Sequence, residues 1–193
     1  MSVGCLVLAA GSSRRLGQPK QLLPYRGRPL LDAVLDTARS VGADQLVVAL
    51  GGAGAEVRAR VDLTGVEVAD NPAFSTGCSS SIAAAVPALH PDTEVLVLLL
   101  GDQPGVSTET VHRLLAGRGD APLAVCRYDD GVGHPFAFGR QVLPDLLRLH
   151  GDKAVWKLLD QRADEVVEVR VDGPVPLDVD TWEDYERLLS STG

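Results

Sequence analysis

The chain has 193 residues, of which 45% are hydrophobic, and a formal net charge of -8 at pH 7. This length and apolar content suffice for the core of one globular domain, so we expect a single domain over residues 1–193. The acidic balance argues against nucleic acid or an anionic membrane as the main partner, because both would select for a basic surface.

The sequence also lacks the signals of export. It contains no apolar run near the roughly 18 residues of a membrane-spanning helix, and its first residues lack the basic and apolar regions of a signal peptide. Cys5, Cys78 and Cys126 are widely spaced and form no C-x-x-C pair, which is typical of reduced thiols rather than of disulfides or a zinc site. We therefore expect a soluble, cytoplasmic protein.

Short apolar runs alternate with helical patterns along the chain. The runs that predict strands are Val3–Leu8, Gln45–Leu50, Gly65–Ala69, Glu94–Leu100, Pro122–Cys126 and Glu165–Val171. Between them, PLLDAVLDTARSVG (29–42) and STETVHRLLAG (107–117) repeat apolar residues at helical spacing and end in glycine. Strands that alternate with helices imply a mainly parallel, Rossmann-like sheet covered on both faces, which is a three-layer α/β/α fold. The stretch YDDGVGHPFAF interrupts this alternation and predicts a small antiparallel excursion around a turn at 129–133.

The first predicted strand leads into a basic loop, AAGSSRRLGQPK. Up to Leu31 the chain carries five basic side chains and no acid, so a small anion is expected there. The glycine spacing fits neither the P-loop pattern nor the dinucleotide pattern G-x-G-x-x-G. The alternative is a basic surface turn that only joins a strand to a helix.

Aspartates follow the fourth predicted strand and recur near the end of the chain. Asp102, in GDQP, lies at the carboxyl end of a buried strand, where open α/β sheets bind ligands. Asp178 and Asp180 alternate in LDVDTWEDY and would point to the same side. Carboxylates suit Mg²⁺, so Asp102 and one of the late aspartates are predicted to share one ion. The alternatives are a turn residue for Asp102 and a helix-start cap for Asp180; Thr181 with Asp184 fits a capping box.

The first loop matches L-A-A-G-x-S-x-R-x-G-x-x-K from Leu8 to Lys20. Further motifs are QPKQLLPYRGRPLLD, NPAFSTGCSSSI, GDQP, GVGHPFAFGR, HGDKAVWKLL and LDVDTWEDY. With these motifs the chain resembles the MobA-like NTP-transferase family, and within it the CTP:molybdopterin cytidylyltransferases. The resemblance implies a nucleotidyltransferase-type sheet and a Mg²⁺ cofactor, with Mn²⁺ as a possible substitute.

The resemblance also implies roles for individual residues. The nucleotide would be held by Leu8, Ala9, Ala10, Gly11, Ser13, Arg15, Lys20, Gly77, Ser79, Ser80 and Ser81. Catalysis would rest on Arg15, Lys20 and Asp102, the metal on Asp102 with Asp180 or Asp178, and the acceptor on Gly133, His134 and Pro135. The alternatives are a capped helix alone for the serines and a structural role for His134.

The implied reaction transfers CMP from CTP to the phosphate of molybdopterin or the molybdenum cofactor and releases pyrophosphate. Ala10 favours CTP by resemblance, and a molybdenum-hydroxylase client or its chaperone is the implied transient partner. Where relatives carry Gly-Ala-Arg this chain has Ala154, Val155 and Trp156, and Trp182 replaces a common proline. Another acceptor (a sugar, polyol or phospholactate phosphate) is therefore an alternative, with Lys153 and Lys157 as nearby cations. A further alternative is a non-catalytic carrier of the finished cofactor, although a carrier needs neither a triphosphate loop nor a metal site.

Overall fold

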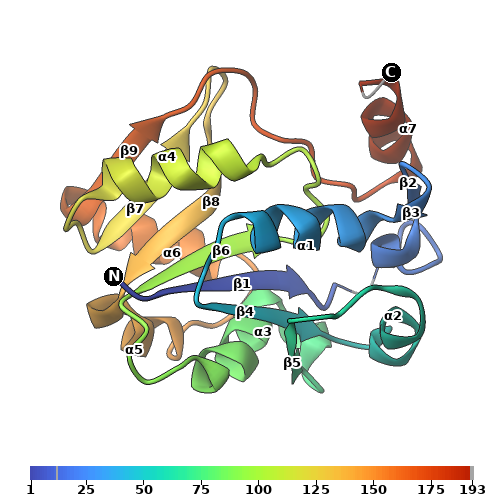
Figure 1. Cartoon of the computed structure of the whole chain (residues 1–193), viewed down its shortest axis with the longest axis horizontal. Helices are drawn as coiled ribbons and strands as arrows, with labels where there is room; N and C mark the ends of the chain where they lie inside the picture. Colours follow the sequence, from blue (N-terminus) through green and yellow to red (C-terminus); the bar gives the residue numbers. More distant parts are fainter. Residues whose placement is uncertain (12, 192–193) are drawn as a thin grey trace.

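The computed structural model describes residues 1–11 and 13–191 (Figure 1). Its strands are β1 (Val3–Ala9), β2 (Pro24–Tyr25), β3 (Arg28–Pro29), β4 (Gln45–Leu50), β5 (Glu67–Asp70), β6 (Val95–Leu100), β7 (Leu123–Arg127), β8 (Val132–Gly139) and β9 (Val166–Arg170). Its α-helices are α1 (Leu30–Ser40), α2 (Gly54–Arg60), α3 (Cys78–Ala85), α4 (Thr108–Arg118), α5 (Leu143–Leu146), α6 (Ala154–Gln161) and α7 (Trp182–Ser190). Every predicted strand is present, and its ends differ from the prediction by at most two residues.

The main sheet has seven strands in the order β5-β4-β1-β6-β8-β7-β9. All its neighbouring strands are parallel except β8, which is antiparallel to β6 and β7. The β7–β8 hairpin is the predicted excursion, closed by a hydrogen bond of 2.8 Å from the Tyr128 N–H to the Gly131 carbonyl. The strands β2 and β3 form a small antiparallel sheet of their own.

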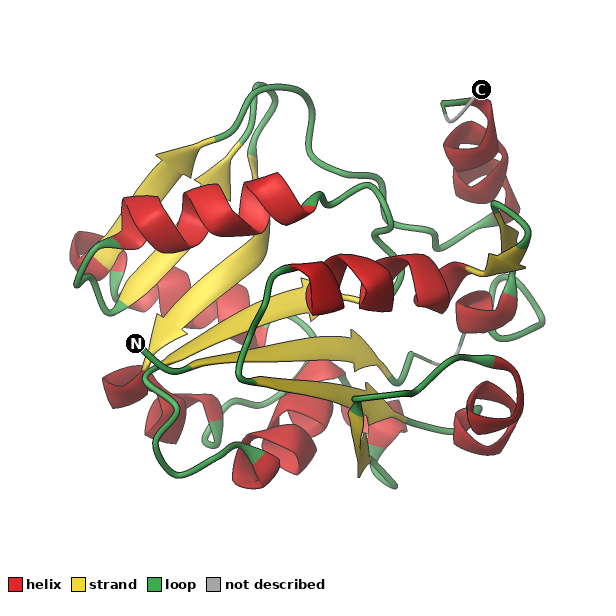
Figure 2. Ribbon diagram, viewed as in Figure 1, coloured by secondary structure: helices red, strands yellow, loops and turns green. Residues whose placement is uncertain are grey.

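Helices cover both faces of the sheet, which confirms the three-layer architecture (Figure 2). Successive side chains of β1 point to opposite faces, so Leu6 packs with α3, α5 and α6 while Cys5 and Val7 pack with α1, α2 and α4. No helix in the described part of the chain is long and apolar enough to cross a membrane.

Two local predictions about helix ends differ in outcome. The capping box of α7 is present, because the Thr181 hydroxyl accepts from the Asp184 N–H and the Asp184 carboxylate accepts from the Thr181 N–H. The prediction that α4 ends at Gly117 is wrong: the helix continues to Arg118, and Gly119 ends it with a φ of 57°. Gly117 has a packing role instead, since a Cβ there would lie 2.8 Å from Val169 of β9.

The strands β1, β4 and β6 end at the same edge of the sheet (Figure 1). The β2–β3 hairpin and α7 lie beyond this edge and share an apolar cluster that includes Tyr25, Leu30, Val179 and Tyr185. The packing of α7 on the N-terminal hairpin therefore brings residues 178–180 to the loops that follow β1 and β6.

Replacing Phe138 with alanine is expected to destabilise the protein by about 3–5 kcal/mol, because its fully buried ring fills the junction of β6, β7 and β8. Urea unfolding measures the change in the free energy of unfolding. The exposed Leu147 is the matched control, and Leu147→Ala should change that free energy by less than about 0.5 kcal/mol. Equal effects of the two substitutions would contradict this packing.

Candidate active site at the carboxyl edge of the sheet

The loop after β1 is held in shape by short-range polar contacts. The Ser13 hydroxyl accepts a hydrogen bond of 3.0 Å from the Lys20 N–H, and the Ser13 carbonyl accepts from the Leu16 N–H. The buried Gln21 amide donates to the carbonyls of Ala9 at 2.6 Å and of Gly11 at 3.3 Å. These two hydrogen bonds from Gln21 therefore fix the backbone of the turn from Ala9 to Gly11.

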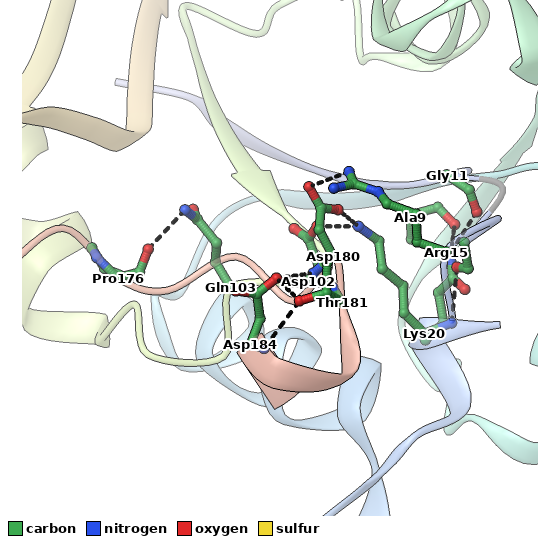
Figure 3. Close-up of polar contacts among 12 residues, drawn as sticks. Ala9, Gly11, Arg15, Lys20, Asp102, Gln103, Pro176, Asp180, Thr181 and Asp184 are labelled. Atoms are coloured by element: carbon green, nitrogen blue, oxygen red, sulfur yellow. Dashed lines mark hydrogen bonds and ion pairs between the residues drawn. The ribbon is translucent and has the colours of Figure 1, made fainter. Parts of the chain in front are cut away.

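The ammonium group of Lys20 lies between two carboxylates from distant parts of the chain (Figure 3). It donates to Asp102, after β6, and at 2.8 Å to Asp180, before α7. Arg15 adds a second cation, with its guanidinium 3.2 Å from Asp180. The Lys20 and Asp102 side chains are only 13% and 15% exposed, whereas Asp180 is 47% exposed. We call Asp102 and Asp180 the carboxylate pair.

Charge and burial act in opposite directions on Lys20. Burial alone lowers the pKa of Lys20. The charge and hydrogen bond of Asp102, and to a lesser extent those of Asp180, raise it by more, so the pKa of Lys20 is above its ordinary value. The hydrogen bond from Lys20 is the largest cause of a lowered pKa at Asp180. Lys20 and Asp180 are therefore both charged at neutral pH.

Two tethers bring the late aspartates to Asp102. The Gln103 amide donates to the Pro176 carbonyl at 3.1 Å (Figure 3). The Val179 N–H donates to the Asp102 carbonyl at 3.2 Å. Because the Thr181 hydroxyl caps α7, the Asp180 side chain is available to Lys20 and Arg15. The capping alternative for Asp180 is therefore not what the structure shows.

Asp178 differs from its neighbour Asp180 in its surroundings. Partial burial of its carboxyl group, and then the negative charge of Asp102, raise the pKa of Asp178 to about 6. The structure thus brings together three aspartates, of which Lys20 directly contacts two, Asp102 and Asp180. Among the described residues no preassembled set of three or more metal-ligating side chains is present.

A pocket of about 550 Å³ opens beside the carboxylate pair. Of the residues predicted for nucleotide binding, catalysis and the metal, it is lined by Leu8, Ala9, Ala10, Gly11, Ser13, Arg15, Lys20, Gly77, Ser81, Asp102 and Asp180. Ser79 is buried and Ser80 bonds to Asn71, Ala73 and Gly77, and neither belongs to the described lining.

The start of α3 forms one wall of this pocket. The Asp152 carboxylate accepts a hydrogen bond of 3.1 Å from the Cys78 N–H, and Gly77 has a φ of 114° with no room for a Cβ beside Asp152. A carboxylate at a helix N-terminus takes the place that a phosphate would otherwise favour. The N-terminus of α3 is therefore already paired with an anion, which argues against a phosphate of the nucleotide at this position.

The residues predicted for the acceptor lie in β8, outside the described lining of the pocket. Gly133 and Pro135 are buried, and the Gly133 backbone lies against Val175. Burial lowers the pKa of His134 to about 3, and its ring stacks on Phe136 with centroids 4.0 Å apart. His134 is therefore a neutral, packed side chain rather than a cation for phosphate.

Eight of the described lining residues were not predicted as site residues from the sequence: Arg14, Gln21, Phe74, Ser75, Cys78, Leu100, Gly101 and Asp152. Gln21 and Asp152 belong to the motifs QPKQLL and HGDK, so the sequence marked their positions. Nothing in the sequence indicated which residues they contact. The Oε1 atom of Gln21 is buried without a hydrogen-bond partner among the described residues.

The sequence profile of the MobA-like NTP transferase domain matches residues 5–166. The chain belongs to the MobA-like NTP transferase family. The matched range contains Arg15, Lys20 and Asp102, and Asp180 lies beyond it.

Two relatives resemble most of the chain. The nicotine blue oxidoreductase of Paenarthrobacter nicotinovorans is 34% identical over 95% of both chains. The bifunctional protein GlmU of Halorhodospira halophila is 37% identical over 88% of this chain, which spans 34% of the length of that relative.

Solved structures of Rv0371c from Mycobacterium tuberculosis H37Rv are closer in sequence. One is 50% identical over 98% of both chains with a TM-score of 0.93. A second, a complex with manganese, is 48% identical over 99% of this chain and 100% of the other, with a TM-score of 0.87.

The raised pKa of Asp178 predicts a pH dependence of stability. Between its ordinary value near 3.8 and its folded value near 6, the folded protein binds a proton that the unfolded chain releases. The stabilisation is complete below this window and is lost as the pH rises through it.

Thermal unfolding in a chelator should therefore show stability falling from pH 4 to pH 6 more steeply in the wild type than in Asp178→Asn. The variant should also be the more stable protein at pH 7. Asp164→Asn, which removes an exposed aspartate far from the pair, is the control and should follow the wild type. Parallel curves for wild type and Asp178→Asn would contradict the assignment.

Proposed function

We propose that this protein is a cytidylyltransferase that transfers CMP from CTP to the phosphate of molybdopterin or the molybdenum cofactor, with release of pyrophosphate. The observation that carries the proposal is the contact of Lys20 with both members of the carboxylate pair, beside a pocket lined by Ala9, Ala10 and Gly11. Cations and carboxylates at one point provide the charges that a triphosphate and its metal require.

The chemistry asks for positioning and neutralisation of charge rather than for covalent catalysis. An oxygen of the ionised acceptor phosphate attacks the α-phosphorus of CTP, and the bond from that phosphorus to the leaving pyrophosphate breaks. No general base is needed, because the attacking phosphate carries no proton at the reacting oxygen. Lys20 and Arg15, whose partners are now carboxylates, stabilise the charge of the departing pyrophosphate.

The carboxylate pair fits a divalent cation. Its two members already share one cation, the Lys20 ammonium, and their hard oxygen donors suit Mg²⁺ or Mn²⁺. When bound, the ion would neutralise charge between the α-phosphate and the leaving group. The manganese complex of Rv0371c supports a divalent metal in this family. Asp178, whose pKa is raised by burial and then by the charge of Asp102, is the alternative to Asp180 as the second ligand.

The remaining assignments rest on different observations. Cytidine as the base follows from the resemblance at Ala10, and Asp152 with Ser81 supplies polar groups where the base would lie. The free thiols Cys5, Cys78 and Cys126 support a reducing compartment such as the cytoplasm. The resemblance also implies a transient contact with a molybdenum-hydroxylase client or its chaperone.

Pyrophosphate release tests the reaction directly. We expect release with Mg²⁺ and CTP in the presence of molybdopterin, and much less with GTP, UTP or ATP. Release with CTP and a sugar, polyol or lactate phosphate, but not with molybdopterin, would support the alternative acceptor. Binding of the finished cofactor without pyrophosphate release from any triphosphate would support the carrier. Because one relative is named as an oxidoreductase, this assay also separates nucleotidyl transfer from other chemistry.

Lys20→Met and Asp102→Asn are each expected to lower kcat by about 10²–10³-fold, because Lys20→Met removes a cation that stabilises the departing pyrophosphate and Asp102→Asn removes a carboxylate that would hold the metal. Steady-state pyrophosphate release measures the effect, and circular dichroism checks that the variants fold. Arg26→Met removes an exposed cation from the turn between β2 and β3 and should retain wild-type turnover. Wild-type rates in Asp102→Asn would remove Asp102 from the mechanism.

A further inference from the structure

A second arginine, Arg14, stands beside Arg15 on the loop after β1. The Leu16 N–H donates to the Ser13 carbonyl at 3.1 Å, so the chain turns tightly with the two arginines at its central positions. Ser13 begins this turn with a φ of 49°, and its hydroxyl accepts a hydrogen bond from the Lys20 N–H. Both arginines belong to the described lining of the nucleotide pocket, so the turn presents two adjacent cations to it.

Arg14 differs from the other cations of the pocket in its partners. The Lys20 ammonium contacts Asp102 and Asp180 (Figure 3). The Arg15 guanidinium lies 3.2 Å from Asp180. Arg14, in contrast, is exposed and forms no ion pair with any other described residue. Within the described lining it is therefore the cation whose charge no carboxylate neutralises by direct contact.

This difference affects how a polyanion reaches the pocket. The described lining carries three basic and three acidic side chains, and the whole chain has a net charge of -8. The chain as a whole therefore repels an approaching triphosphate, and Lys20 and Arg15 can bind it only after they leave their carboxylates. A charge at the exposed rim of a site acts mainly on the rate of association, whereas a buried, hydrogen-bonded charge acts mainly on the rate of dissociation.

We infer that Arg14 binds the triphosphate first, and that Lys20 and Arg15 exchange their carboxylates for it in a second step. The inference rests on the proposed function and adds the order in which the binding residues act. The first step uses an exposed charge and is therefore sensitive to salt. The second step frees the carboxylate pair for the metal.

Stopped-flow kinetics with a fluorescent CTP labelled on the ribose, in Mg²⁺ and without an acceptor, test this order. Arg14→Met should lower the association rate constant about fivefold and change the dissociation rate constant by less than about twofold. Arg14→Lys should retain most of the wild-type association rate, because it keeps the charge. Added NaCl should reduce the difference between the wild type and Arg14→Met. Lys20→Met should instead act mainly on dissociation.

Arg140→Met is the matched control. Arg140 is also exposed and forms no ion pair with any other described residue, but it lies at the opposite edge of the sheet. It directly follows β8, whose last residue, Gly139, pairs with Val95 at the start of β6. This variant changes the net charge as Arg14→Met does and should associate at the wild-type rate. A fluorescent CMP, which lacks the β- and γ-phosphates, should associate equally fast with Arg14→Met and the wild type, which also shows that the variant folds.

Three results would overturn the inference: an unchanged association rate of CTP in Arg14→Met, an equal fall in Arg140→Met, or a loss of affinity in Arg14→Met that arises mainly from faster dissociation. The proposed function fails separately. A protein that binds CTP through Arg14 in this order but releases no pyrophosphate with any acceptor would keep the first binding step and lose the reaction.

Discussion

The shared contact of Lys20 with Asp102 and Asp180 is the interaction on which the rest of the site depends. It joins the first loop to segments 82 and 160 residues further along the chain. A lysine that is 13% exposed is tolerated only because carboxylates compensate its desolvation, and the carboxylates in turn are held near one another by its charge. The packing of α7 on the β2–β3 hairpin supplies the scaffold for this three-way contact.

This arrangement has a consequence for ligand binding. The carboxylate pair cannot give its full charge to a metal ion while Lys20 is bound to both members. A triphosphate offers Lys20 and Arg15 other anions and so releases the pair for the metal. Binding of the nucleotide should therefore raise the affinity for the metal, and binding of the metal should raise the affinity for the nucleotide by the same factor.

The sequence was sufficient wherever the determining signal is local. Short apolar runs located the strands, and Thr181 with Asp184 predicted the capping box of α7. The short helices α2, α5 and α6, with seven, four and eight residues, offered too few turns for periodicity to predict them. The tethers from Gln103 to Pro176 and from Asp152 to Cys78 span 73 and 74 residues, and no local pattern encodes such contacts.

The central claim is that Lys20 neutralises the carboxylate pair until a nucleotide binds, and that the pair then binds a metal ion. Titration of Mn²⁺ followed by electron paramagnetic resonance, with and without a CTP analogue that has a methylene bridge between the α- and β-phosphates, tests it most directly. We predict that the analogue tightens Mn²⁺ binding by about tenfold or more, and that Lys20→Met removes most of this coupling. Equal Mn²⁺ affinity with and without the analogue in the wild type would contradict the account.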